Sequence, residues 1–113
     1  MSDRVVAFST VGRAEDAERI ARALVERRLA ACVNVLPGVV SVYRWEGEVC
    51  RSEELLLIVK TRTERLGALR EALVELHPYD LPELVALPIE SGHTPYLAWL
   101  DESVQQDPGT RQG

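Results

Sequence analysis

Apolar and polar residues alternate with a period of two along residues 39–50, a pattern that predicts a long β-hairpin. Val40 and Val42 fall on one face of its first strand, and the intervening residues fall on the other. Glu46-Gly47 predicts a tight turn, because Gly47 readily adopts a positive φ. Typical strands have about five or six residues, so this hairpin is expected to extend beyond the other strands of its sheet. Its exposed edge predicts an obligate oligomer in which another copy covers it.

The remaining chain alternates between strand and helix patterns. Apolar residues recur at three- and four-residue spacing over 12–28, and again between Thr61 and Pro78, which predicts two amphipathic helices. Thr61 and Glu64 have the spacing of a capping box for the second helix. Thr94-Pro95 is typical of an N-cap followed by the first position of a third helix. Strands are expected at 5–10, 32–36 and 84–89, and the second strand of the hairpin is expected to end at Lys60. Pro37-Gly38 predicts a kink or bulge. The short third helix is expected at 96–104.

This order of elements predicts an α+β fold, the split βαβ or ferredoxin-like arrangement with a long hairpin and a C-terminal helix. Right-handed crossovers place the third strand between the first two, so the antiparallel sheet has the order 4-1-3-2. Both long helices then cover one face of the sheet. The other face is left open and is expected to need a partner.

Strand direction predicts which polar residues gather at one end of the sheet. The first strand ends there, the second helix delivers its C-terminal loop there, and the fourth strand begins there. Lys60 falls at the opposite end of its own sheet, so it reaches this cluster only from a neighbouring chain. The residues expected in the cluster are Ser9, Thr10, His77, Tyr79 and Glu83.

Composition narrows the function classes. A chain of 113 residues with a net charge of −5 predicts one domain and argues against nucleic acid as the main partner. It has no run of eighteen apolar residues and no signal-peptide pattern, so a cytoplasmic location without a membrane partner is expected. Two cysteines predict reduced thiols and no disulfide framework. Cys32 is interpreted as a core residue and Cys50 as no part of a site.

Several runs together resemble the CutA family of divalent-cation tolerance proteins. The resemblance extends over roughly residues 5–104 of a single domain, and residues 105–113 are predicted to form a polar tail. It implies a ferredoxin-like protomer, a tight homotrimer resembling PII signalling proteins, and a role linked to copper or other divalent ions. The runs are LAACVN at 29–34, Pro37-Gly38, SVYRWEGE at 41–48, Lys60-Thr61, His77-Pro78-Tyr79, Pro82-Glu83 and YLAWL at 96–100.

The resemblance also implies a metal site, which this chain matches only in part. Some family members have a thiol and two adjacent histidines, but here Ser9 and Leu76 replace the thiol and the first histidine. Copper and zinc sites need several nitrogen or sulfur donors. We therefore expect no tightly bound cofactor and only weak copper or other divalent binding through His77. The alternative is a purely structural histidine at a helix C-terminus.

A ligand cleft between subunits is the second candidate site. Its expected residues are Trp45, Lys60, Tyr79, Glu83 and Trp99, and a small anionic ligand would be held by Lys60 and positioned by Tyr79. An intersubunit ion pair with a carboxylate is the alternative interpretation of Lys60. Packing between subunits is the alternative for both tryptophans.

Three classes of function follow. The leading hypothesis is a trimeric, non-enzymatic binding or signalling module in the divalent-metal response. The second is a small-molecule enzyme that uses the cleft, with Glu83 or His77 carrying a proton. The third is a structural trimeric scaffold. The sequence contains no glycine-rich phosphate loop and no nucleophile elbow, so no catalytic residue is predicted.

Overall fold

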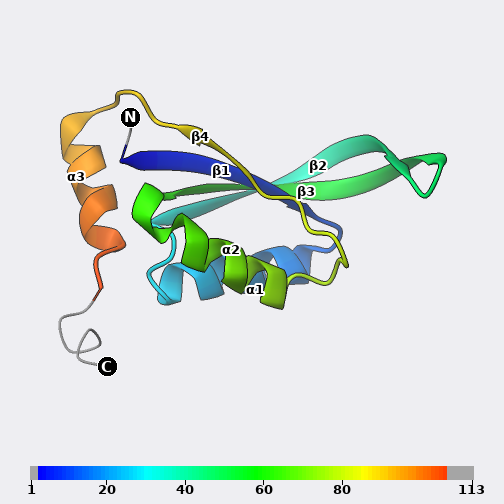
Figure 1. Ribbon diagram of the computed structural model, residues 1–113, viewed down its shortest axis with the longest axis horizontal. Coiled ribbons are helices and arrows are strands. Elements are labelled where there is room, and N and C mark those ends of the chain that lie inside the picture. The colour runs from blue at the N-terminus through cyan, green and yellow to red at the C-terminus, as the bar shows by residue number, and fades with distance from the viewer. Residues whose placement is uncertain (1–2, 107–113) are drawn as a thin grey trace.

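A four-stranded antiparallel sheet in the order β2-β3-β1-β4 forms the centre of the protein, as the sequence predicted (Figure 1). The computed structural model describes residues 3–106. Within that part of the chain, no helix is long and apolar enough to cross a membrane. The elements are β1 (Arg4–Val11), α1 (Ala14–Glu26), β2 (Cys32–Trp45), β3 (Glu48–Arg62), the 3-10 turn η1 (Thr63–Arg65), α2 (Leu66–Leu76), β4 (Val85–Pro88) and α3 (Thr94–Ser103).

The main core lies between the sheet and helices α1 and α2, which cover the same face (Figure 1). Alternate residues of β1 are buried, beginning with Val5 and Ala7. Leu57 and Val59 continue this layer across β3, because Leu57 pairs with Ser9 and Val59 pairs with Ala7. Burying each large apolar side chain stabilises the fold by about 1.5–3 kcal/mol. The helices supply Ala17, Ile20, Leu24, Leu69, Ala72 and Leu73 to this core.

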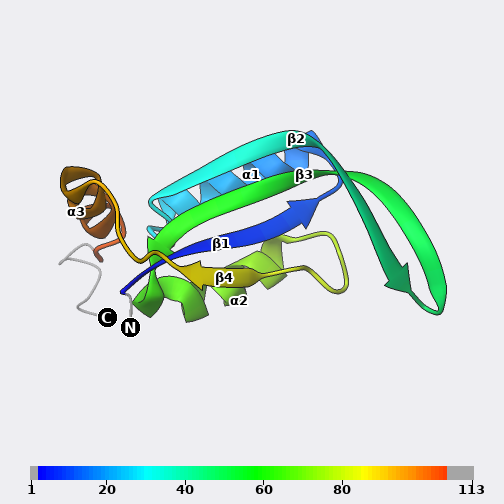
Figure 2. The ribbon, with the colours of Figure 1, turned by 90° about the horizontal axis from the view of Figure 1, so that it is seen from above.

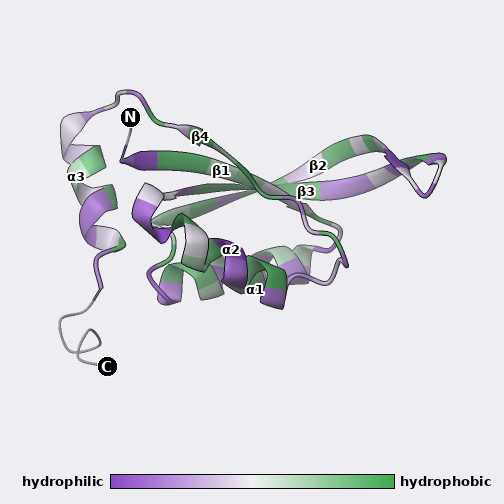
Figure 3. Cartoon of the chain, viewed as in Figure 1, coloured by the Kyte–Doolittle hydropathy of each residue, from purple (hydrophilic) through white to green (hydrophobic). Residues whose placement is uncertain are grey.

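The opposite face of the sheet carries no helix and is largely apolar. Phe8 on β1 lies beside Ile58 on β3 and Val85 on β4. Leu36 and Leu87 on this face keep 51% and 57% of their surface exposed. Figure 3 shows the hydrophobic character of β1 and β4. The single chain therefore leaves an apolar sheet face open to solvent, as the sequence predicted.

The β2–β3 hairpin extends well beyond the sheet, as its length predicted. Strand β3 pairs with β1 only as far as Leu55, so residues 48–54 pair with β2 alone. Glu46 and Gly47 form the two-residue turn with φ values of 51° and 83°, the positive values that a type I′ turn requires. A bulge at Pro37-Gly38 interrupts the β2–β3 register. Figure 2 shows that the hairpin then curves toward the loop that follows α2.

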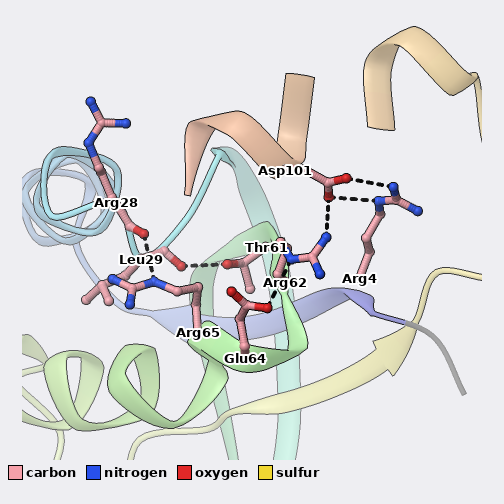
Figure 4. A network of polar contacts seen from close by, with 8 residues as sticks. All are labelled: Arg4, Arg28, Leu29, Thr61, Arg62, Glu64, Arg65 and Asp101. Atoms are coloured by element: carbon pink, nitrogen blue, oxygen red, sulfur yellow. Dashed lines mark hydrogen bonds and ion pairs between the residues drawn. The ribbon is translucent and has the colours of Figure 1, made fainter. Parts of the chain in front are cut away.

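Two predicted helix caps are wrong. Thr61 is the second-last residue of β3, and its buried hydroxyl donates a 2.8 Å hydrogen bond to the carbonyl of Leu29 (Figure 4). The N-cap residue of η1 is Arg62 and that of α2 is Arg65, and neither makes a side-chain capping hydrogen bond. Helix α3 begins one residue early, so His93 occupies the N-cap position without a side-chain hydrogen bond. The Thr61 hydroxyl instead fixes the α1–β2 connection onto the end of β3.

Helix α3 lies at the end of the sheet farthest from the hairpin tip (Figure 1). Leu100 and Val104 form a small second core with Ala31. Asp101 accepts hydrogen bonds from Arg4 at 2.7 and 3.0 Å and from Arg62 at 2.7 Å, which fixes α3 to β1 and β3 (Figure 4). Most of the predicted polar tail, from residue 107 onward, lies outside the described residues.

Candidate functional site

A groove lies between the curved hairpin and the loop that joins α2 to β4. Its volume is about 790 Å³, within the size range of small-molecule sites in proteins. The loop and the hairpin approach each other at the end of the sheet where β1 finishes (Figure 2). The residues that line the groove are Thr10, Ser41, Val42, Tyr43, Arg44, Trp45, Ser52, Glu54, Tyr79, Asp80, Leu81 and Glu83.

One face of the hairpin forms a wall of the groove. Tyr43 and Trp45 are two residues apart on β2, so their side chains lie on the same face. Both are more than 40% exposed, which leaves aromatic surface open to the groove. The hydroxyl groups of Tyr43 and Ser52 are hydrogen bonded across the strand pair at 2.7 Å. This bond fixes the Tyr43 ring against β3.

Tyr79 joins the loop to the hairpin at the other side of the groove. Its hydroxyl donates a 2.7 Å hydrogen bond to Oε2 of Glu54. Glu54 is only 7% exposed, although it lines the groove. Burial of the phenol raises the pKa of Tyr79 well above its ordinary value, and the bond to Glu54 raises this pKa further. Tyr79 therefore stays a neutral hydrogen-bond donor to the carboxylate at physiological pH.

His77 positions Tyr79 and has both ring nitrogens engaged. Its Nδ1 accepts a 3.1 Å hydrogen bond from the backbone N–H of Tyr79, so the proton of the neutral ring is on Nε2. Nε2 donates to the carbonyl of Thr10 at 2.8 Å. The rings of His77 and Tyr79 also pack with their centroids 4.6 Å apart. His77 is 6% exposed and links the end of β1 to the loop after α2.

The structure brings together three of the five residues predicted for the cleft. Trp45, Tyr79 and Glu83 line the groove of one chain. Lys60 lies at the opposite end of the sheet, paired with Val6, as its strand position predicted. Its ammonium donates to the side-chain amide oxygen of Asn34, and no carboxylate pairs with it among residues 3–106.

Trp99 is also remote from the groove in one chain. It lies on α3, where its ring packs against Tyr96 with centroids 5.3 Å apart. Helix α3 and the hairpin tip with Trp45 are at opposite ends of the sheet (Figure 1). Trp45 and Trp99 can share a site only if they come from different chains.

Ser9 does not join the predicted cluster of polar residues. It is 1% exposed and shares the helix-covered face of β1 with Ala7. Its buried hydroxyl has no hydrogen-bond partner within the described residues. The groove instead uses Thr10, which the alternation of β1 places on the other face.

Glu54 is the most buried of the groove residues that the sequence analysis missed. It follows another glutamate before a long apolar run, which is typical of a solvated strand end. A signal was nonetheless present, because alternation along β3 places Glu54 on the same face as Ser52 and Leu56. Only the curvature of the hairpin turns this face toward the loop after α2.

The described residues do not fit a tight metal site. Within residues 3–106, no three side chains of the His, Cys, Asp or Glu type lie close enough together to hold an ion. His77 has no free ring nitrogen in this arrangement. The prediction of a core position for Cys32 is wrong: this free thiol is half-buried opposite Lys60, and its Sγ lies 3.8 Å from the side-chain oxygen of Asn34.

The fold and the groove define a small ferredoxin-like domain with a ligand-sized groove under a long hairpin. Residues 5–103 match the family described as CutA1 divalent ion tolerance protein. The chain therefore belongs to the CutA1 family, as the resemblance in its sequence indicated.

Individual relatives agree with this assignment. The divalent-cation tolerance protein CutA of Thermus thermophilus is 55% identical over 98 residues, which is 87% of this chain and 95% of that protein. The Xenopus laevis CutA homolog is 48% identical over 90 residues, which is 80% of this chain and 60% of that protein. The crystal structure of CutA1 from Oryza sativa has a TM-score of 0.90 at 44% identity, over 94% of this chain and 97% of that one.

Proposed function

We propose that this protein is a trimeric, non-enzymatic binding module of the divalent-cation response, and that the groove beside Tyr79 is its ligand site. Family membership supports the link to divalent cations. The observation that carries the binding role is the groove, whose shape is fixed by the Tyr79–Glu54 hydrogen bond. We also propose a cytoplasmic location, in keeping with the two free cysteines.

The open sheet face supports the trimer. Apolar strands without a helix cover, together with the unpaired hairpin edges, are surfaces that oligomers bury. Lys60 and Trp99 lie far from the groove of their own chain (Figure 1), so each can contribute to a ligand site there only from a neighbouring chain of such a trimer. A small anionic ligand requires that contribution, since the groove of one chain holds three carboxylates and one guanidinium.

The metal-ligating side chains of this chain argue against a mechanism in which the protein confers divalent-cation tolerance by binding the ion tightly. A lone buried histidine with both nitrogens engaged does not fit copper or zinc, which need several nitrogen or sulfur ligands. We therefore propose that the protein binds divalent ions weakly, or that it responds to them indirectly through whether the groove holds its ligand.

Native mass spectrometry of protein purified from its own source tests this proposal. The expected spectrum contains a trimer that retains a small molecule, and a folded monomer at micromolar concentration would contradict it. A substrate screen tests the enzyme alternative: turnover that disappears in Glu83→Gln would replace the binding module with a catalyst. If alanine substitutions in the groove do not change metal tolerance, the structural trimeric scaffold would be the favoured function.

A further inference from the structure

Glu54 is a buried carboxylate whose charge is not balanced by the described part of its own chain. It is 7% exposed, and its Oε2 accepts a hydrogen bond from the neutral hydroxyl of Tyr79. Among residues 3–106, no arginine, lysine or histidine forms an ion pair with it. Buried charges in proteins are normally paired, because a hydrogen bond from a neutral group offsets only part of the lost hydration. A neighbouring chain can only bury Glu54 further, so the compensating charge is expected on the surface that covers it.

Lys60 is a cation in the complementary situation. It is half-buried, and its ammonium donates to the side-chain oxygen of Asn34, which is a neutral acceptor. The strand register places Arg4 and Arg62 on the same open face of the sheet, and both of these pair with Asp101. Within residues 3–106, Lys60 is therefore the cation of this face that has no carboxylate partner.

Glu54 and Lys60 occupy opposite ends of one face of β3. The pairing of β3 with its neighbours is regular between them, so alternation places Leu56 and Ile58 on the same face in the space between the two charges. At about 3.3 Å per residue, the two charged residues are roughly 20 Å apart along the strand and cannot meet within one chain. This face thus has an acidic end and a basic end joined by an apolar stripe. A copy that packs on it from end to end would bring opposite charges together and cover the apolar residues.

We infer that Lys60 of one chain enters the groove of the next chain and forms a buried ion pair with Glu54, so that the ligand site beside Tyr79 is complete only in the oligomer. The inference rests on the proposed trimer, because in a closed ring each chain presents its acidic end to one neighbour and its basic end to the other. Tyr79 would act as the positioning residue, since its hydrogen bond holds the Glu54 carboxylate in place.

A double-mutant cycle of Glu54→Gln and Lys60→Met tests the pair, with assembly measured by sedimentation in increasing urea. Each single substitution leaves the other charge buried without its partner, so the dissociation constant of the trimer is expected to rise by roughly tenfold or more. The double variant removes both charges and is expected to recover most of this loss. Losses that add in the double variant would overturn the inference. A double variant that assembles no better than the single variants would do so too.

Glu53→Gln is the matched control in the same cycle. Glu53 is the adjacent residue, but it is exposed, lies on the opposite face of the hairpin and is 3.8 Å from Arg51. Glu54→Gln is therefore expected to rescue the assembly of Lys60→Met, and Glu53→Gln is expected not to. Equal rescue by the two substitutions would show that only the net charge matters, and the inference would be wrong.

Mixed trimers test whether the pair forms between chains. Where a Glu54→Gln chain meets a Lys60→Met chain, the contact either has both charges or has neither, whereas every contact in a trimer of one variant has a lone charge. The two variants are mixed in urea and refolded together, with one of them isotopically labelled for native mass spectrometry. Mixed trimers are expected to exceed the binomial proportions that labelled and unlabelled parent chains give. Binomial proportions for the variants would overturn the inference.

The parent protein in these experiments separates the inference from the proposed function. A trimeric parent whose variants lose stability additively refutes the ion pair and leaves the trimeric module standing. A parent that sediments as a folded monomer refutes the trimer, and the ion pair with it.

Discussion

The hydroxyl of Tyr79 donates a 2.7 Å hydrogen bond to Glu54, which joins the loop after α2 to the hairpin across 25 residues of sequence. The ring of His77 packs against the ring of Tyr79, and its Nε2 donates a hydrogen bond to the carbonyl of Thr10 at the end of β1. The extended hairpin is therefore held over the groove by a side-chain contact in addition to its own strand pairing. This contact makes Tyr79 the residue whose removal tests the site most directly.

Tyr79→Phe is expected to lower the free energy of unfolding by roughly 1–3 kcal/mol. The change removes the hydroxyl and leaves the nearly buried Glu54 carboxylate without its donor, while the ring and its packing on His77 are kept. Urea denaturation at a fixed protomer concentration measures the effect, because unfolding of an oligomer depends on concentration.

Tyr96→Phe is the control for this loss. Tyr96 has nearly the same exposure, 41% against 38% for Tyr79, but its hydroxyl has no hydrogen bond within the described residues. Its removal is expected to change stability by less than about 0.5 kcal/mol. Equal losses of stability in the two variants would show that the hydrogen bond from Tyr79 to Glu54 does not stabilise the fold.

Alkaline pH is expected to weaken the fold through the same residue. Burial and the bond to Glu54 raise the pKa of Tyr79 in the folded protein, whereas an unfolded tyrosine ionises near pH 10. The stabilising contribution is therefore complete below about pH 10 and declines above it, where the unfolded chain binds fewer protons than the folded one. The stability difference between the parent and Tyr79→Phe should shrink over this range. A difference that grows with pH would contradict this assignment.

Local patterns in the sequence were sufficient to predict the sheet order, the helix-covered face and the hairpin. Alternation along β1 and β3 determines which residues face the helices, and Gly47 and the Pro37-Gly38 bulge mark the turn and the register shift. The groove was not predictable in this way, because it depends on how far the hairpin curves. The twist of two strands and the bulge set that curvature, and one bond between distant residues, Tyr79 and Glu54, holds it.

The wrong predictions have a common physical cause. Thr61 has the spacing of a helix cap, but β3 extends past it and its hydroxyl bonds to the carbonyl of Leu29 instead. Cys32 stands in an apolar run, but its register with Lys60 places it on the open face of the sheet. In both cases a tertiary partner outside the local window decides the role of the side chain.

Ser9→Ala is expected to stabilise the protein by about 1 kcal/mol. The hydroxyl of Ser9 is buried on the helix-covered face and has no hydrogen-bond partner among the described residues, so folding removes it from water without compensation. Ser52→Ala is the comparison, since it removes the bonded partner of the Tyr43 hydroxyl and should not stabilise. Thermal unfolding of both variants gives the answer, and destabilisation by Ser9→Ala would indicate a partner for this hydroxyl.

Asp101→Asn is expected to loosen helix α3. Hydrogen bonds from Arg4 and the charge of Arg62 lower the pKa of Asp101, so its carboxylate stabilises the fold above the unfolded pKa and loses this effect as the pH falls through the lowered value. The difference in melting temperature between the parent and Asp101→Asn should therefore be constant near neutral pH and shrink as the pH falls below the ordinary aspartate pKa of about 3.9. Amide exchange in α3 should rise in the variant at neutral pH. A difference that persists in strong acid would assign the effect to packing.

Weak metal binding is the last expectation, and it follows from the hydrogen bonds of His77. An ion at either ring nitrogen must displace the bond from the Tyr79 N–H or the bond to the Thr10 carbonyl, and no second nitrogen or sulfur donor converges on the site within residues 3–106. Calorimetry with copper(II) or zinc should therefore give micromolar or weaker binding, on the order of −8 kcal/mol or less favourable. The chain has two histidines, so His93→Ala, in an exposed loop, is the matched control for His77→Ala. A nanomolar isotherm that disappears in His77→Ala but survives in His93→Ala would show that the loop after α2 rearranges to form a true metal site.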